Sequence, residues 1–147
     1  MRRNNSPTGC SDGSRSRNDV KMGKTIIGTA GVEGLPLSEA ILAGGFVFLS
    51  GLVGFGSDGR IVPGGIAAET DAIFAQVKHL LAQAGATLED VVKVNVYLSD
   101  AAEFDGFNTA YRKYFPQAPP ARISLSVRLT IDARVELDLI AFVGHAA

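Results

Sequence analysis

Arg122 stands near the start of a segment whose pattern predicts a β-strand with one polar face. The segment PPARISLSV, residues 119–127, alternates polar and apolar residues after its two prolines, as half-buried strands do. The polar positions share one face of the predicted strand: Arg122, Ser124, Ser126 and Arg128. A guanidinium on a rigid strand can bind both oxygens of a carboxylate at once. A solvated strand face with two exposed arginines would give the same pattern, so the residues alone leave both interpretations open.

Glu136 is the second charged candidate, in the segment VELDLIAF at residues 135–142. Glu136 and Asp138 alternate with apolar residues, so the two acids share one strand face, which again could simply be solvated. If a short turn at residues 130–133 joins this strand to the preceding one as a hairpin, Glu136 and Arg122 lie roughly 17 Å apart along the sheet. One chain could then hardly bring both to one small ligand. We therefore expect a site between two neighbouring chains.

The sequence lacks the residue patterns of metal sites, nucleophile motifs and dinucleotide-binding loops. The only histidines are His79 and His145, and no cluster of cysteines or carboxylates accompanies them at ligand spacing, so we expect no metal site. The segment LSGLV around Ser50 is not a nucleophile motif of the G-x-S-x-G type. The segment GFGSDG, residues 54–59, does not open a helix directly after a buried strand, as a dinucleotide-binding fingerprint would.

The composition is that of a chain with enough apolar residues for one folded domain. The sequence has 147 residues, 46% of them hydrophobic, and a formal net charge of −1. This length suits a single domain. A net charge of −1 gives no excess of basic residues with which to bind nucleic acid. No apolar run approaches the roughly 18 residues of a membrane span. We therefore expect neither nucleic acid nor a membrane as a partner.

Residues 1–22 differ in composition from the rest of the chain. They contain five basic and two acidic residues, a net charge of +3, and few apolar ones. This predicts a disordered or non-native tail before a single domain at residues 23–147. No apolar segment follows Arg3, as a secretory signal requires, and Cys10 is the one cysteine. We therefore expect a cytoplasmic protein in a reducing compartment.

The rest of the sequence predicts alternating strands and helices. Helices are expected at residues 66–84 and 100–115, and strands at residues 24–30, 35–44, 46–54, 90–98, 122–129 and 134–143. Two helices at this spacing would pack on one face of a mixed sheet, which is an α+β fold. No element remains to cover the other face, so we expect an oligomer.

Four segments together resemble a known family. FVFLSGLVG, VVKVNVYLSDAAEFDGFNTAYRKYF, PPARISLSV and VELDLIAF, in this order and spacing, are similar to the RidA/YjgF family of reactive-intermediate (enamine/imine) deaminases. The likeness covers about residues 38–143. It implies a chorismate-mutase-like α+β fold, with two helices on one face of a mixed sheet, assembled as a homotrimer with three clefts between subunits.

The resemblance also implies roles for six residues. The family's carboxylate-binding arginine corresponds to Arg122, and the acidic residue that holds the attacking water corresponds to Glu136. The implied substrate-binding residues are Ser50, Gly51, Asn108 and Ser124. The implied reaction is the hydrolysis of short 2-imino or enamine acids to 2-keto acids and ammonia. No cofactor is expected, because the imine carbon is already electrophilic.

Two departures from the family pattern favour further hypotheses. Leu37 stands where an aromatic residue is often found, and Leu52 where a polar one is common. Both would make the pocket more apolar, which suits a specialised catabolic enamine deaminase acting on a 2-aminomuconate-like substrate. A non-catalytic module that binds a small carboxylate is a further alternative. The RNA cleavage attributed to some relatives is disfavoured by the absence of a basic stripe.

Overall fold

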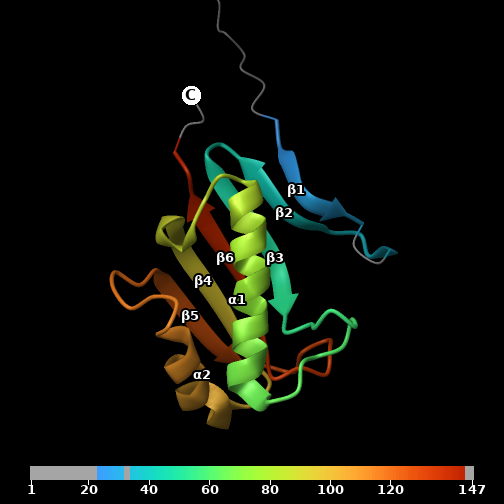
Figure 1. Ribbon diagram of the computed structural model, residues 1–147, viewed down its shortest axis with the longest axis vertical. Coiled ribbons are helices and arrows are strands. Elements are labelled where there is room, and N and C mark those ends of the chain that lie inside the picture. The colour runs from blue at the N-terminus through green and yellow to red at the C-terminus, as the bar shows by residue number, and fades with distance from the viewer. Residues whose placement is uncertain (1–22, 32–33, 145–147) are drawn as a thin grey trace, which may run out of the picture.

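A six-stranded mixed sheet, covered on one face by two helices, forms the fold in the computed structural model, which describes residues 23–31 and 34–144 (Figure 1). The predicted tail at residues 1–22 lies outside the described residues. The strands are β1 (Thr25–Ala30), β2 (Ser38–Ala43), β3 (Phe46–Val53), β4 (Val91–Leu98), β5 (Ala121–Ser126) and β6 (Val135–Phe142). The helices are α1 (Gly65–Gln83) and α2 (Phe104–Tyr111), with short 3-10 turns η2 (Leu88–Asp90) and η3 (Ala101–Glu103). The predicted α+β class is confirmed.

The helix α1 is built on the apolar stripe that the sequence predicts. Its buried face consists mainly of Ile73, Phe74, Val77, Leu80 and Leu81, at the three- and four-residue spacing of one helix side. Glycines flank the helix, and Gly85 beyond its end has a φ of 71°, which suits a helix terminus. The helix packs against β3 and β6. No helix in the described part of the chain is both long and apolar enough to span a bilayer.

The strand β6 lies at the centre of the sheet, whose order is β1-β2-β3-β6-β4-β5. Its residues Val135, Leu137, Leu139 and Ala141 are fully buried under the helices. Because side chains alternate along a strand, Glu136 and Asp138 point to the other, open face of the sheet.

The predicted hairpin between the last two strands is wrong. β5 pairs in parallel with β4, and β6 pairs antiparallel with both β3 and β4, so β4 separates β5 from β6. The reason is the helix α2 between β4 and β5. A helical crossover returns the chain to the end at which β4 began, so the two strands run in parallel. The following loop then passes β4, and β6 gains two neighbours in place of one.

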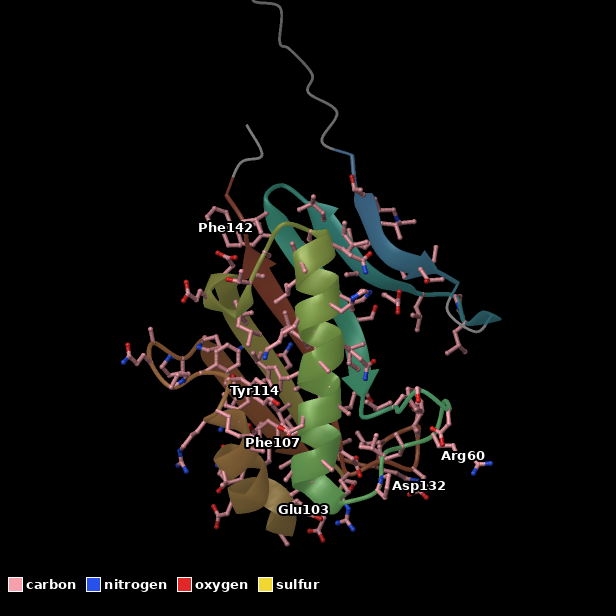
Figure 2. All side chains as sticks on the ribbon, in the orientation of Figure 1. Arg60, Glu103, Phe107, Tyr114, Asp132 and Phe142 are labelled. Carbon is pink, nitrogen blue, oxygen red and sulfur yellow. The ribbon has the colours of Figure 1, made fainter. Side chains whose placement is uncertain are left out.

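The open face of the sheet carries exposed apolar side chains. On β5, Ile123 and Leu125 are 45% and 48% exposed. At the opposite end of the strands the rings of Phe46 and Phe142 contact each other, with centroids 4.8 Å apart, and Figure 2 labels Phe142. The two helices lie on the opposite face (Figure 1). The uncovered face expected from the sequence is therefore present in the single chain.

Phe74 links α1 to the chain that follows α2, and its truncation should destabilise the fold. Its ring is fully buried, stacks on Tyr114 at 4.1 Å and meets Phe115 edge-on at 5.7 Å. We expect Phe74→Ala to lower the free energy of unfolding by about 3–5 kcal/mol, measured by urea denaturation. The control Leu35→Ala removes a side chain that is 53% exposed and should cost less than about 0.5 kcal/mol. Equal losses in both variants would contradict this account of the core.

Candidate functional site

Arg122 lies in an aromatic pocket between β5 and α2. Its guanidinium carbon is 5.8 Å from the ring centroid of Phe104, 5.6 Å from that of Phe107 and 4.8 Å from that of Tyr111. These three residues follow the helical spacing that places side chains on one face. Aromatic faces attract a cation, so the rings hold the guanidinium in place. Its Nη2 also donates a hydrogen bond of 2.8 Å to Oδ1 of Asn108, so two of the predicted site residues are in contact.

The polar face of β5 points toward the helices. Arg122 pairs with Val94 and Ser124 with Val96, and both valines are fully buried. Residues paired across neighbouring strands share a face, so Arg122 and Ser124 lie on the helix side. The apolar residues of this strand face outward instead. The alternation predicted from the sequence is present, but its polar side is the inner one.

Two buried hydroxyl groups beside Arg122 have no hydrogen-bond partner among the described residues. They are the side chains of Tyr111 and Ser124. Buried polar groups normally have a partner, so each of these hydroxyls has hydrogen-bonding capacity that the single chain does not use. Burial raises the pKa of Tyr111 to about 12, although the charge of Arg122 acts in the opposite direction. The phenol therefore stays protonated at neutral pH.

A cavity of about 710 Å³ opens beside Arg122. Its walls combine this cation with aromatic rings and prolines: Asn108, Tyr111, Arg112, Phe115, Pro116, Pro119, Pro120 and Arg122. Small-molecule sites are typically apolar with a few convergent polar groups. The pocket therefore has the chemistry to bind a small organic anion. We call Arg122, Asn108, Tyr111 and Ser124 the arginine half-site.

Glu136 belongs to a second group of residues, on the open face of the sheet. β3 contains a bulge, because Leu49 pairs with Leu139 while Leu52 pairs with Leu137. The bulge leaves Gly51 against Glu136, and a Cβ at Gly51 would collide with the carboxylate. Bulges of this kind often re-aim a strand beside a functional site.

Ser50, in the same bulge, is anchored to the neighbouring strand. Its hydroxyl donates a hydrogen bond of 2.6 Å to the carbonyl oxygen of Ser38. Gly51 therefore lies against Glu136, and Ser50 is its neighbour in the bulge. We call these three residues the glutamate half-site.

The environment of Glu136 favours its protonated form. Partial burial raises the pKa of Glu136, and the negative charge of Asp138 raises it further. Asp138 itself is held by β4: Asn95 Nδ2 donates to one carboxylate oxygen at 2.8 Å, and the hydroxyl of Tyr97 donates to the other at 3.1 Å. These three residues were not predicted as part of a site.

The two half-sites lie on opposite faces of one chain. Arg122 is level with Leu139 through Val94, so it lies three residues along and two strands across from Glu136. At standard strand spacing their Cα atoms are roughly 14 Å apart. The separation expected from the sequence assumed a hairpin that does not form. The observed pairing still keeps the two side chains of one chain too far apart to reach one small ligand.

The two leucines that depart from the family pattern have different surroundings. Leu52 is 9% exposed and belongs to the hydrophobic core, so the expectation that it makes the pocket more apolar is wrong. The bulge explains this, since it turns Leu52 inward opposite Leu137. Leu37 precedes β2 and is 40% exposed.

Comparisons with known proteins agree on one family. Residues 33–143 match the family model described as Endoribonuclease L-PSP. A RutC family protein of Pyrococcus abyssi is 40% identical over 109 residues, covering 73% of this chain and 86% of the relative. The 2-iminobutanoate/2-iminopropanoate deaminase of Bos taurus is 35% identical over 111 residues, covering 74% of this chain and 81% of the relative.

A yeast relative provides a structural match. The protein named "MMF1, mitochondrial" of Saccharomyces cerevisiae is 36% identical over 105 residues, covering 71% of this chain and 72% of the relative. The crystal structure of yeast Mmf1 superposes with a TM-score of 0.76 at 33% identity, covering 82% of this chain and 98% of that one. Because the name of this relative places it in mitochondria, the cytoplasmic localisation of the present chain stays a prediction. The sequence matches and the shared fold show that this chain belongs to the Endoribonuclease L-PSP family, which is the RidA/YjgF family.

Proposed function

We propose that this protein hydrolyses short 2-imino acids and their enamine tautomers to 2-keto acids and ammonia. The observation that carries the proposal is Arg122, a guanidinium held by aromatic rings beside a cavity of about 710 Å³. Relatives named as 2-iminobutanoate/2-iminopropanoate deaminases, at about 35% identity, support the reaction type.

Arg122 is proposed to bind the substrate carboxylate. Its Nη2 already donates to Asn108, which fixes the plane of the guanidinium and leaves its other N–H groups for the ligand. A planar fork can donate two parallel hydrogen bonds to a carboxylate. Ser124 lies two residues further along the same face, and its unpartnered hydroxyl can bind a second polar atom of the substrate.

Glu136 is proposed to hold and deprotonate the attacking water. The water oxygen bonds to the imine carbon while Glu136 takes a proton, and the substrate nitrogen is protonated in turn. Glu136 then transfers the remaining hydroxyl proton to the nitrogen as the C–N bond breaks, so ammonia leaves and the carbon keeps the oxygen as a ketone. The electrophilic C=N bond needs no added activation, so positioning supplies most of the catalysis.

Ser50 and Gly51 are proposed to line the substrate cleft beside Glu136. Gly51 leaves room for the carboxylate, since any larger residue would displace it. The Ser50 hydroxyl donates to Ser38, and its oxygen can still accept a hydrogen bond from the substrate.

The complete site is proposed to form between two copies of the chain. The arginine half-site lies at β5, which is an edge strand of the sheet, and the glutamate half-site lies on the opposite face. A neighbouring copy that covers the open face would bring its glutamate half-site toward the first chain's arginine half-site. A homotrimer with three such clefts, as the family resemblance implies, uses every half-site once.

Two alternatives make different predictions for the same cleft. A specialised catabolic deaminase would hydrolyse a larger enamine, such as a 2-aminomuconate-like acid, and leave 2-iminobutyrate to its uncatalysed hydrolysis. A non-catalytic binding protein would take up small carboxylates, dependent on Arg122, with no turnover of either substrate.

Replacement of Arg122 should abolish the acceleration. A threonine or serine dehydratase generates 2-iminobutyrate or 2-iminopropionate in situ, and 2-keto acid release is followed beside the uncatalysed hydrolysis. We expect Arg122→Ala to lower kcat/KM by about 100-fold or more, the loss of two charge-assisted hydrogen bonds. Arg122→Lys keeps the charge without the fork and should fall between the two.

Arg60→Ala is the matched control for this experiment. Arg60 is exposed on the loop after β3, away from α2 (Figure 2), and its loss should leave the rate unchanged. Full activity in Arg122→Ala would overturn the proposed role of the arginine.

Glu136→Gln should lower kcat by about 10²- to 10⁴-fold, the usual contribution of a general base. In the wild type the active form is the deprotonated one. Since burial and Asp138 raise the pKa of Glu136, kcat/KM should decline with falling pH at a higher pH than for an exposed glutamate. A pH–rate profile measures this, and an acidic limb that persists unchanged in Glu136→Gln would assign it to another group.

Sedimentation at micromolar concentration should show a trimer. Leu125→Arg places a charge on the open face, where this residue is 48% exposed, and should dissociate the assembly and lower activity with it. Ala82→Arg changes an exposed position on α1 and should leave the trimer intact. A wild-type monomer with full activity would contradict a site shared between subunits.

A further inference from the structure

Asp138, Asn95 and Tyr97 form a polar network on the open face that the proposed reaction does not use. Each carboxylate oxygen of Asp138 accepts one hydrogen bond, from Asn95 at 2.8 Å and from Tyr97 at 3.1 Å. Two donors aimed at separate oxygens match a carboxylate. Both are side chains of a neighbouring strand, so they hold Asp138 in one orientation.

The register of the sheet places this network directly beside Glu136. Asn95 is paired with Asp138, and Tyr97 is paired with Glu136. The Tyr97 hydroxyl therefore reaches diagonally past Glu136 to bind Asp138. The two acids are two residues apart on one strand face, where side chains are neighbours.

The remaining side of Glu136 has no charged neighbour in the described chain. From β3 it meets Gly51, which has no side chain, and Val53, its apolar cross-strand partner. The titratable groups that face Glu136 are therefore Asp138 of its own strand and Tyr97 of β4. Burial and hydrogen bonding to Asp138 raise the pKa of the Tyr97 phenol, so Tyr97 is neutral at physiological pH and Asp138 supplies the charge.

We propose that Asp138 is a positioning residue for Glu136, held by Asn95 and Tyr97 so that its fixed negative charge keeps the neighbouring carboxylate basic. This inference rests on the proposed role of Glu136 as the base. A like charge nearby disfavours the ionised form of an acid. A stronger base takes a proton from water more readily, so the network adjusts the group that reacts without touching the substrate.

A purely structural network would stabilise the sheet and leave the titration of Glu136 unchanged. The test therefore measures the titration directly, by ¹³C NMR of the side-chain carboxyl groups in protein labelled at glutamate. The Glu136 signal is identified by its absence in Glu136→Gln. Asp138→Asn removes the charge and keeps the shape, and Asp138→Ser is a second variant without the charge. Glu89→Gln removes an exposed acid elsewhere in the chain.

We expect the pKa of Glu136 to fall in both Asp138 variants and to stay constant in Glu89→Gln. The acidic limb of the kcat/KM profile should move to lower pH by the same amount. The maximal kcat of Asp138→Asn should lie between those of the wild type and Glu136→Gln, with KM little changed. Tyr97→Phe keeps the charge but frees one oxygen of Asp138, and should lower kcat by less than Asp138→Asn.

The outcomes separate the two proposals. Full activity in Glu136→Gln would overturn the proposed catalytic base while the NMR titration still decided whether Asp138 tunes Glu136. An unchanged Glu136 titration in both Asp138 variants would overturn the positioning role, even with Glu136→Gln inactive. If the wild type did not turn over imines at all, the NMR titration alone would decide whether Asp138 raises the pKa of Glu136.

Discussion

The strict alternation of side chains along a strand is the constraint on which the rest of this structure depends. β6 lies at the centre of the sheet and buries Val135, Leu137 and Leu139 completely under the helices. Its other residues have only the open face left to them. Glu136 therefore cannot face α2, whatever its function. Arg122 faces α2 for the converse reason, because its pairing with the buried Val94 turns it inward.

Each half-site draws on a different kind of support. The guanidinium is held by the aromatic rings of α2 and by a hydrogen bond to Asn108 of the same helix. The carboxylate is surrounded by a glycine, a second acid and its two hydrogen-bond donors. The first arrangement holds the permanent positive charge of Arg122. The second adjusts the pKa of Glu136, whose proposed role requires it to gain and lose a proton. This division suits a proposed reaction in which one group binds and the other exchanges a proton.

The sequence alone was enough to predict every main strand and helix, because the apolar spacing of α1 and the alternation of β5 and β6 are local properties. The same alternation drew attention to Arg122 and Glu136, whereas the other site residues came from the family resemblance, and the roles of all of them stay predictions. The pairing of β5 with β4 could not be predicted, since it depends on the path of the α2 crossover. Asn95 and Tyr97 were missed for the same reason: only the register between β4 and β6 shows that they face Asp138.

The bulge in β3 also sets the phase of that strand. Before it, Val47 and Leu49 face the core, and after it the inward residue is Leu52, so the parity of the buried positions changes at Ser50–Gly51. Deleting one residue there would restore regular alternation with Val47, Leu49 and Leu52 still facing the core, but it would remove the extra backbone that places Gly51 against Glu136. Because a side chain at Gly51 would also meet Glu136, this stretch is constrained in residue type as well as in length. Insertions and deletions among relatives should fall outside it, in the loops that connect the strands.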